Sequence, residues 1–68
     1  MAEAIENKVY ELRQKAGVTQ EALADELGVS RQTVIAIERG NYTPSVLLAL
    51  KIAQYFKVPV ERIFSIIN

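Results

Sequence analysis

The residue types that carry out most catalytic and metal-binding chemistry are scarce in this sequence of 68 residues. It contains no cysteine and no histidine, which excludes disulfides, thiolate and imidazole metal sites, cysteine nucleophiles and Ser-His-Asp triads. The acids Glu21, Asp25 and Glu26 remain, but a chain this short rarely forms a cleft that shields two carboxylates. We therefore interpret these acids as a solvated face, and we expect no enzyme activity, no metal ion and no cofactor.

Residues 20–39 show a pattern of small, glycine and apolar residues that is typical of two crossing helices. Within it lies a run of hydrogen-bonding side chains, Ser30-Arg31-Gln32-Thr33. Two short helices that cross steeply need a small side chain at the crossing point, which Ala24 provides. They also need a turn that tolerates a positive φ, and Gly28 suits it. The core-facing positions must be apolar, as they are at Leu23, Leu27, Val29, Val34 and Ile37. The pattern predicts a helix-turn-helix whose second helix exposes polar side chains at its start.

Five short helices are expected to position this motif, and they cover about residues 5–16, 20–27, 31–39, 46–56 and 60–64. In the first, apolar residues recur every three or four positions, at Ile5, Val9, Leu12 and Ala16. Hydroxyl residues suited to N-caps precede three of the helices, at Thr19, Ser30 and Ser45. Ile63 and Phe64 are expected to point inward from the fifth helix. Seven further residues are expected in the core, in addition to Val29: Leu23, Leu27, Val34, Ile37, Leu50, Ile52 and Ala53.

The composition predicts one small globular domain over residues 1–68. Half of the residues are apolar and 24% are charged, with a formal net charge of zero. The charge is uneven, because residues 1–30 hold six acids and three bases, whereas residues 31–68 hold five bases and two acids. No apolar run approaches the ~18 residues of a membrane span. Without cysteine, the cytoplasm is the expected compartment.

From Leu12 to Phe64 the sequence resembles the Cro/C1-type (lambda-repressor-like, XRE) family of helix-turn-helix regulators. Five segments in the same order carry this resemblance: Thr19–Ala24, Leu27–Val34, Ile37–Gly40, Tyr42–Ser45 and Leu48–Ala53. It implies an all-α, five-helix DNA-binding domain of the small stand-alone type. It also allows a short two-stranded ribbon in which the segment around Ile5 meets residues 65–67.

The resemblance assigns roles to individual residues. The base-contacting candidates at the start of the recognition helix are Arg31, Gln32 and Ala36, since Arg pairs with guanine, Gln with adenine and a methyl with thymine. The phosphate-contacting candidates are Gln20, Ser30, Thr33, Arg39, Asn41 and Tyr42. Arg13 and Glu38 match a structural ion pair of the family. Each position also has a plain alternative, such as a solvated helix face, a turn Asn or a packing Tyr.

Two departures from the family pattern concern the second half of the chain. Leu47 stands where a charged or polar residue is common, while Lys57 and Pro59 replace the usual Gly and hydroxyl cap. One small domain has little interior left for its many late apolar residues. A homodimer interface is therefore expected at Leu47, Tyr55, Phe56, Val58, Phe64, Ile66 and Ile67.

The resulting expectation is a sequence-specific regulator that binds double-stranded DNA, in the form of a dimeric repressor reading a palindromic operator with residues 31–39 in the major groove. The alternative is an antitoxin or protein-interaction adaptor with the same fold. The expected partners are DNA and a second copy of the chain, with no membrane and no small-molecule ligand.

Overall fold

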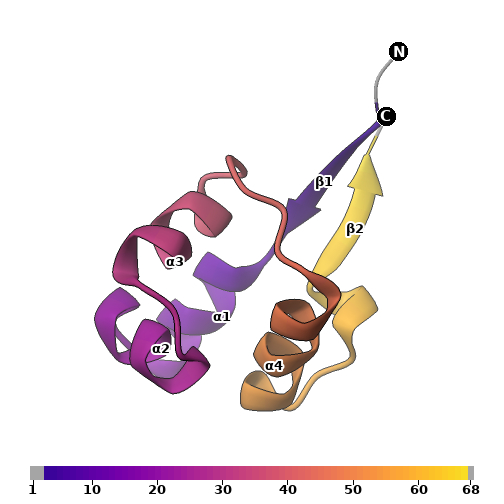
Figure 1. Cartoon of the computed structure of the whole chain (residues 1–68). Helices are drawn as coiled ribbons and strands as arrows, with labels where there is room; N and C mark the ends of the chain where they lie inside the picture. Colours follow the sequence, from indigo (N-terminus) through magenta and orange to yellow (C-terminus); the bar gives the residue numbers. More distant parts are fainter. Residues whose placement is uncertain (1–2, 68) are drawn as a thin grey trace.

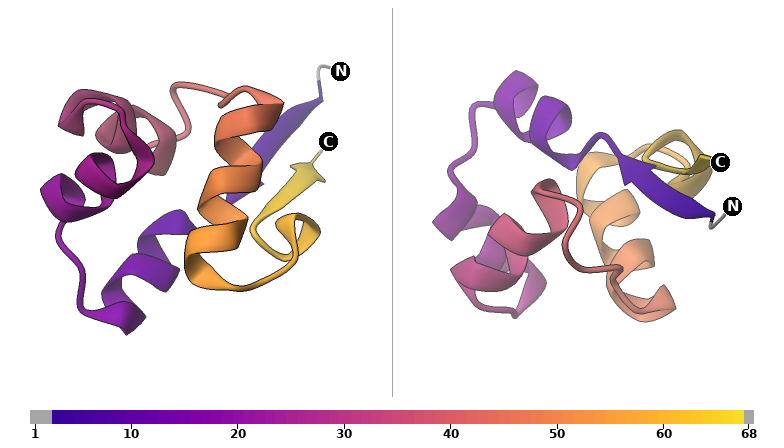
Figure 2. Two further views of the ribbon diagram at one scale, coloured as in Figure 1. Left: turned by 60° about the horizontal axis from the view of Figure 1, so that its bottom comes forward. Right: turned by 90° about the horizontal axis from the view of Figure 1, so that it is seen from above.

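A computed structural model describes residues 3–67 as a helical body with a projecting two-stranded ribbon (Figure 1). Its elements are β1 (Ala4–Asn7), α1 (Val9–Ala16), α2 (Gln20–Leu27), α3 (Arg31–Glu38), α4 (Val46–Phe56), the 3-10 helix η1 (Val60–Arg62) and β2 (Phe64–Ile67). Figures 1 and 2 show α2 and α3 on one side of the body and α4 on the other. The ribbon leaves the body so that both ends of the described chain lie at its tip.

The three hydroxyl caps begin three of the helices, as the sequence predicts. The side-chain oxygens of Thr19, Ser30 and Ser45 accept hydrogen bonds from backbone N–H groups three residues later, at 3.0, 3.2 and 3.1 Å. Between α2 and α3, Gly28 adopts a left-handed conformation with φ +74°, which favours glycine because it has no Cβ. These local signals fix where α2, α3 and α4 begin and how α2 turns into α3.

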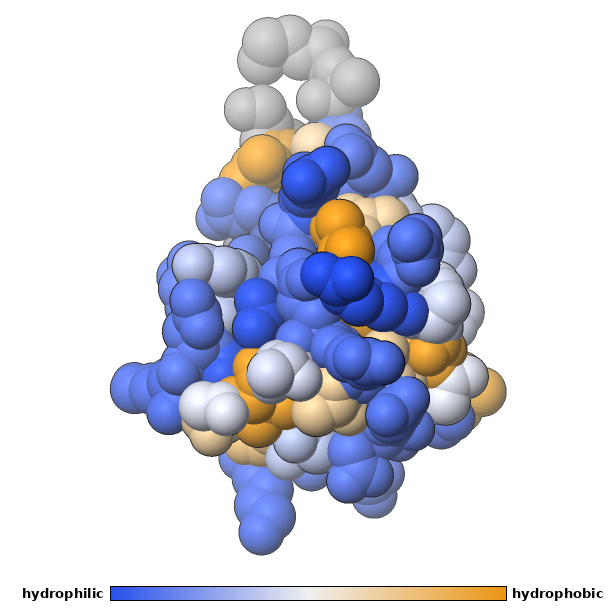
Figure 3. Space-filling model, turned by 90° about the vertical axis from the view of Figure 1, so that its left-hand side faces the viewer, coloured by the Kyte–Doolittle hydropathy of each residue, from blue (hydrophilic) through white to orange (hydrophobic). Residues whose placement is uncertain are grey.

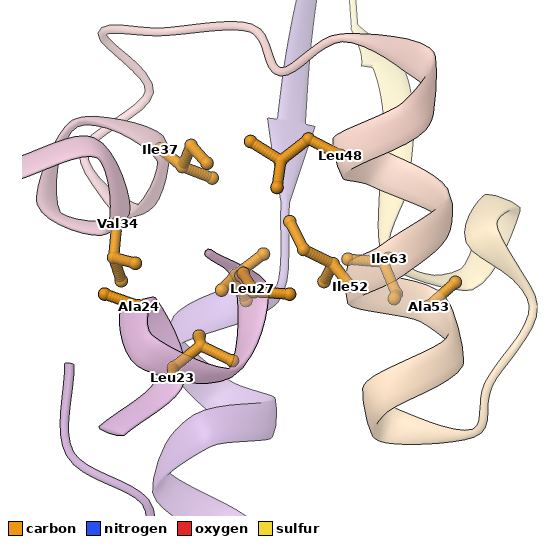
Figure 4. Close-up of a cluster of buried hydrophobic side chains, with 10 residues drawn as sticks. Leu23, Ala24, Leu27, Val34, Ile37, Leu48, Ile52, Ala53 and Ile63 are labelled. Carbon is orange, nitrogen blue, oxygen red and sulfur yellow. The ribbon is translucent and has the colours of Figure 1, made fainter. Parts of the chain in front are cut away.

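The core lies where α2, α3 and α4 face one another, and Figure 4 shows most of the labelled side chains in the space between these helices. Its buried apolar residues are Val9, Leu23, Ala24, Leu27, Val34, Ile37, Leu48, Ile52, Ala53 and Ile63. Leu50 was expected in this core, but that prediction is wrong, because its side chain is 52% exposed. Leu48 and Ile52, four residues apart on one helix face, are buried instead.

The first helix begins at Val9, and the prediction that it begins near Ile5 is wrong. Residues 4–7 form β1, which pairs antiparallel with β2 and places Ile5 opposite Ile66. Asn7 ends the strand: its Oδ1 accepts from the N–H of Val9 at 3.0 Å, and its Nδ2 donates to the Ile37 carbonyl at 2.9 Å. The two-stranded ribbon that the family resemblance allows is therefore present, and the described fold is not all-α.

The expected fifth helix is also absent from residues 3–67, which contain four α-helices. Only the single 3-10 turn η1 forms, after Pro59, which offers no side-chain cap. Phe64 then enters β2, where pairing with Asn7 requires an extended backbone. The inward position expected for Ile63 is confirmed, since only 1% of it is exposed.

Lys57 ends α4 in the left-handed conformation with φ 59°, the only non-glycine residue with positive φ in the described part of the chain. The N–H of the next residue, Val58, donates to the Ala53 carbonyl at 3.2 Å. This is the backbone geometry that glycine usually provides after a helix. The replacement of Gly by Lys therefore changes the residue but leaves the left-handed turn.

Residues 3–67 contain neither a membrane-spanning helix nor a cluster of metal-binding side chains. None of the described helices is both long enough and apolar enough to cross a membrane. Nor do the acidic side chains of this part of the chain form a group that could hold a metal ion.

Candidate nucleic-acid interface

Helix α3 has one face in the core and one face in solvent. Val34 and Ile37 are buried, and successive helical residues are separated by about 100°, so Gln32 and Arg39 lie on the opposite side. Arg31, Gln32 and Arg39 are exposed, whereas Ile35 and Ala36 beside them are half-buried. Figure 3 shows the side of the molecule that carries α2 and α3, and its surface is mainly hydrophilic.

The start of α3 is fixed by two hydroxyl groups that bind each other. Ser30 Oγ caps the helix and lies 3.1 Å from Thr33 Oγ1. The first turn contains no acidic residue, so the partial positive charge of the helix N-terminus is not offset within that turn. Arg31 and Gln32 extend from this rigid, electropositive start.

An ion pair attaches the end of α3 to α1. Arg13 Nε donates to Glu38 Oε2 at 2.7 Å and Arg13 Nη2 donates to Oε1 at 3.1 Å, while Nη1 donates to the Val18 carbonyl at 3.0 Å. The two side chains are only 9% and 5% exposed. The hydrogen bond to Glu38 raises the pKa of Arg13, against a smaller lowering by burial. The Arg13 guanidinium therefore stays charged and holds α3 in one orientation.

Glu38 also binds the first residue of α2. Gln20 Nε2 donates to Glu38 Oε1 at 3.2 Å, so a single carboxylate links α1, α2 and α3. An amide nitrogen has two hydrogens, and this bond uses one of them. Gln20 is thereby held beside α3.

A shallow hollow of about 350 Å³ opens at this junction. We call it the α3 hollow, and its lining residues are Tyr10, Gln20, Arg31, Ile35, Glu38 and Arg39. Because Glu38 is paired with Arg13, the charges left to act on a ligand are those of Arg31 and Arg39. The hollow suits an anionic partner.

Sequence reasoning missed two residues of the α3 hollow, Tyr10 and Ile35. Tyr10 accepts a hydrogen bond from Gln14 Nε2 at 2.8 Å, and its ring centroid lies 5.4 Å from the Arg13 guanidinium carbon. Tyr10 lies three residues before Arg13 on the same helix face, and this spacing could have predicted the contact between the two side chains. Ile35 gave no such signal, because it lies within an apolar run.

The remaining phosphate candidates lie apart from the α3 hollow. Asn41 follows α3 and its N–H donates to the Ala36 carbonyl at 2.9 Å. Tyr42 lines a second depression, between the α2–α3 turn and the start of α4, together with Gly28 and Leu47. The structure thus brings Gln20, Arg31 and Arg39 together, and it places Asn41 and Tyr42 elsewhere.

Comparisons with known proteins agree with this geometry. The profile of the HTH_3 helix-turn-helix family matches residues 9–63. The chain belongs to this family. The Cro/C1-type resemblance found in the sequence is therefore confirmed.

Named relatives in the family are described as transcriptional regulators. The HTH-type transcriptional regulator YgzD of Bacillus subtilis is 53% identical over 60 residues, which cover 88% of this chain and 91% of YgzD. The cryptic phage CTXphi transcriptional repressor RstR of Vibrio cholerae is 30% identical over 59 residues, covering 87% of this chain and 53% of RstR. The solved structure of the restriction-modification controller protein C.AhdI from Aeromonas hydrophila is 33% identical, with a TM-score of 0.74, and the match covers 81% of this chain and 83% of C.AhdI.

The late apolar residues of this HTH_3 domain fall into two groups. Four of the expected interface residues are half-buried against the domain's own core: Tyr55, Phe56, Val58 and Phe64. The rings of Tyr55 and Phe56 pack edge to face, with their centroids 5.0 Å apart. The domain therefore accommodates more of these apolar side chains than its small size suggests, and a role of these four residues in a dimer interface stays a prediction.

The second group is exposed, and it includes Leu50, which the sequence predicts in the core. Leu47, Ile66 and Ile67 are 67%, 67% and 41% exposed. On α4, Val46 and Leu50 are exposed as well. Leu47 and Leu50 are three residues apart and form, with Val46, an apolar surface on the outer side of α4, which we call the α4 patch.

Proposed function

We propose that the chain is a sequence-specific transcriptional regulator that inserts the exposed face of α3 into the major groove of double-stranded DNA. The observation that carries this proposal is the pair of exposed side chains Arg31 and Gln32 on the capped first turn of α3. Arg and Gln make the bidentate contacts that distinguish guanine and adenine in that groove. Membership of the HTH_3 family supports the same reading.

The α3 hollow supplies the groups that would fix the helix on the duplex. Gln20 and Arg39 border α3 on this side and suit contacts with phosphate oxygens, which set register without reading sequence. The Arg13–Glu38 pair removes the charge of Glu38 from the approach of the DNA backbone. Ser30, Thr33, Asn41 and Tyr42 are further candidates for phosphate contact, and Ala36 for a base.

Dimerisation is the second part of the proposal. The formal net charge of the chain is zero, so one copy gains little from general attraction to DNA, and two copies double the number of phosphate contacts. The α4 patch gathers three exposed large apolar side chains on one helix, and a second copy of it is the partner of matching chemistry. Two such domains read a palindrome with half-sites about one helical turn apart.

Repression is the regulatory outcome that we propose. A dimer bound to an operator that overlaps a promoter would occlude that promoter. The similarity to RstR, which is named as a transcriptional repressor, supports this outcome.

Selection from a pool of random duplexes tests the proposal. We expect enrichment of a palindrome with half-site centres about ten base pairs apart, and protection of the same site in footprinting. A pool that yields no enriched sequence would reject sequence-specific binding and favour the alternative of an antitoxin or adaptor that holds a protein partner.

A further inference from the structure

An isolated isoleucine lies on the surface that the proposed function assigns to DNA. Ile35 lines the α3 hollow together with Arg31 and Arg39, which precede and follow it by four residues and are therefore its neighbours along α3. The side chain is half-buried and not enclosed in the core. On the outer face of α3 it is bordered by charged and polar side chains and by the smaller Ala36.

The position of Ile35 restricts what it can contact. Ile35 is three residues after Gln32, so both side chains extend from neighbouring positions of the same helix face. An isoleucine side chain has no hydrogen-bond donor or acceptor. In the major groove the base-edge group that suits an apolar side chain is the C5-methyl group of thymine.

We propose that Ile35 is a specificity-determining residue that contacts a thymine methyl group in each half-site. This inference rests on the proposed function, since it requires α3 in the major groove. The thymine lies next to, or within, the base pair that Gln32 contacts. Ile35 thereby adds an apolar preference for thymine to the hydrogen bonds of Arg31 and Gln32.

Replacing single thymines of the selected duplex by deoxyuridine tests this contact, because the exchange removes the methyl group and keeps every hydrogen-bonding group. With the wild-type protein, one thymine per half-site should show about a fourfold loss of affinity, the value of one apolar methyl-sized contact. With Ile35→Ala, the thymine and deoxyuridine duplexes should bind equally at that position. Ile5→Ala, at an exposed isoleucine on β1, is the matched control and should keep the fourfold preference.

The outcomes separate this inference from the proposed function. If a palindrome is selected but no deoxyuridine exchange reduces affinity, or if Ile35→Ala keeps the full thymine preference, the Ile35 contact is rejected and DNA reading by α3 stands. In the second case, loss of the preference in Ala36→Gly would assign the methyl contact to Ala36. If no sequence is selected, both proposals fail. Thermal unfolding of Ile35→Ala establishes that the variant is folded at the assay temperature.

Discussion

The side chain of Glu38 links three helices through hydrogen bonds. It receives two hydrogen bonds from Arg13 on α1 and one from Gln20 on α2, while its own backbone belongs to α3. Both charged partners are almost fully shielded from water, so neither is easily rehydrated if the other is removed. The ion pair therefore ties the orientation of the proposed recognition helix to the scaffold.

Glu38→Ala should destabilise the domain by about 3 kcal/mol, because the Arg13 guanidinium would remain buried without its partner. Urea unfolding measures this loss. Glu61→Ala, at an exposed acid of η1, should change stability by less than about 0.5 kcal/mol. The double variant Arg13→Met/Glu38→Leu should recover much of the loss, since it leaves no buried charge. A change below about 0.5 kcal/mol for Glu38→Ala would contradict this account.

At the level of single residues, roles could be predicted from the sequence only at positions that match the family pattern. Arg13 and Glu38 were expected together and lie within hydrogen-bonding distance. Ile35 was missed because it stands in the run Val34-Ile35-Ala36-Ile37, in which only the helical rotation separates core from surface.

At the level of elements, the predictions succeeded where the decisive interactions are local. Caps and the Gly28 turn lie within a few residues of the helices that they delimit, and α2, α3 and α4 were expected almost at their observed bounds. The periodicity placed Ile5 in the first helix, and only the family resemblance allowed β1 as one strand of a ribbon. Its strand conformation depends on β2, about 60 residues away, and on the contact between Asn7 and Ile37. Such long-range contacts leave no trace in a local pattern.

Lys57→Gly should stabilise the domain by about 1 kcal/mol, because a residue with a Cβ is strained in the left-handed conformation at the end of α4. The measurement is the free energy of unfolding from chemical denaturation. Gln54→Gly, at an exposed interior position of the same helix, is the control and should lose about 1 kcal/mol. Equal losses in both variants would show that the left-handed turn at Lys57 carries no strain.

At the level of the whole molecule, the two proposed functional surfaces lie on different helices. The α3 hollow involves α1, α2 and α3, whereas the α4 patch lies on the helix across the core from them (Figure 2). A second copy bound at the α4 patch would leave the α3 hollow accessible, while Leu47 at the edge of the patch shares a depression with Tyr42. The proposed dimer can present two α3 helices to one duplex.

Leu47→Glu should dissociate the proposed dimer, because it places a charge within the α4 patch. Light scattering at micromolar concentration should give twice the chain mass of 7.6 kDa for the wild-type protein and the single mass for the variant. Ala22→Glu adds the same charge at an exposed position of α2 and should remain dimeric. A wild-type protein with the mass of one chain would contradict dimerisation, as would a dimeric Leu47→Glu variant.

The affinity of Gln32→Ala for the selected duplex and for its single base-pair variants shows whether α3 reads bases. We expect the variant to lose discrimination at one position in each half-site, by about 1–3 kcal/mol, and to keep the other preferences. Gln20→Ala, which removes a proposed phosphate contact, should weaken binding to every duplex by a similar factor. If Gln32→Ala also weakens every duplex equally, Gln32 does not contact a base and the account of α3 is wrong.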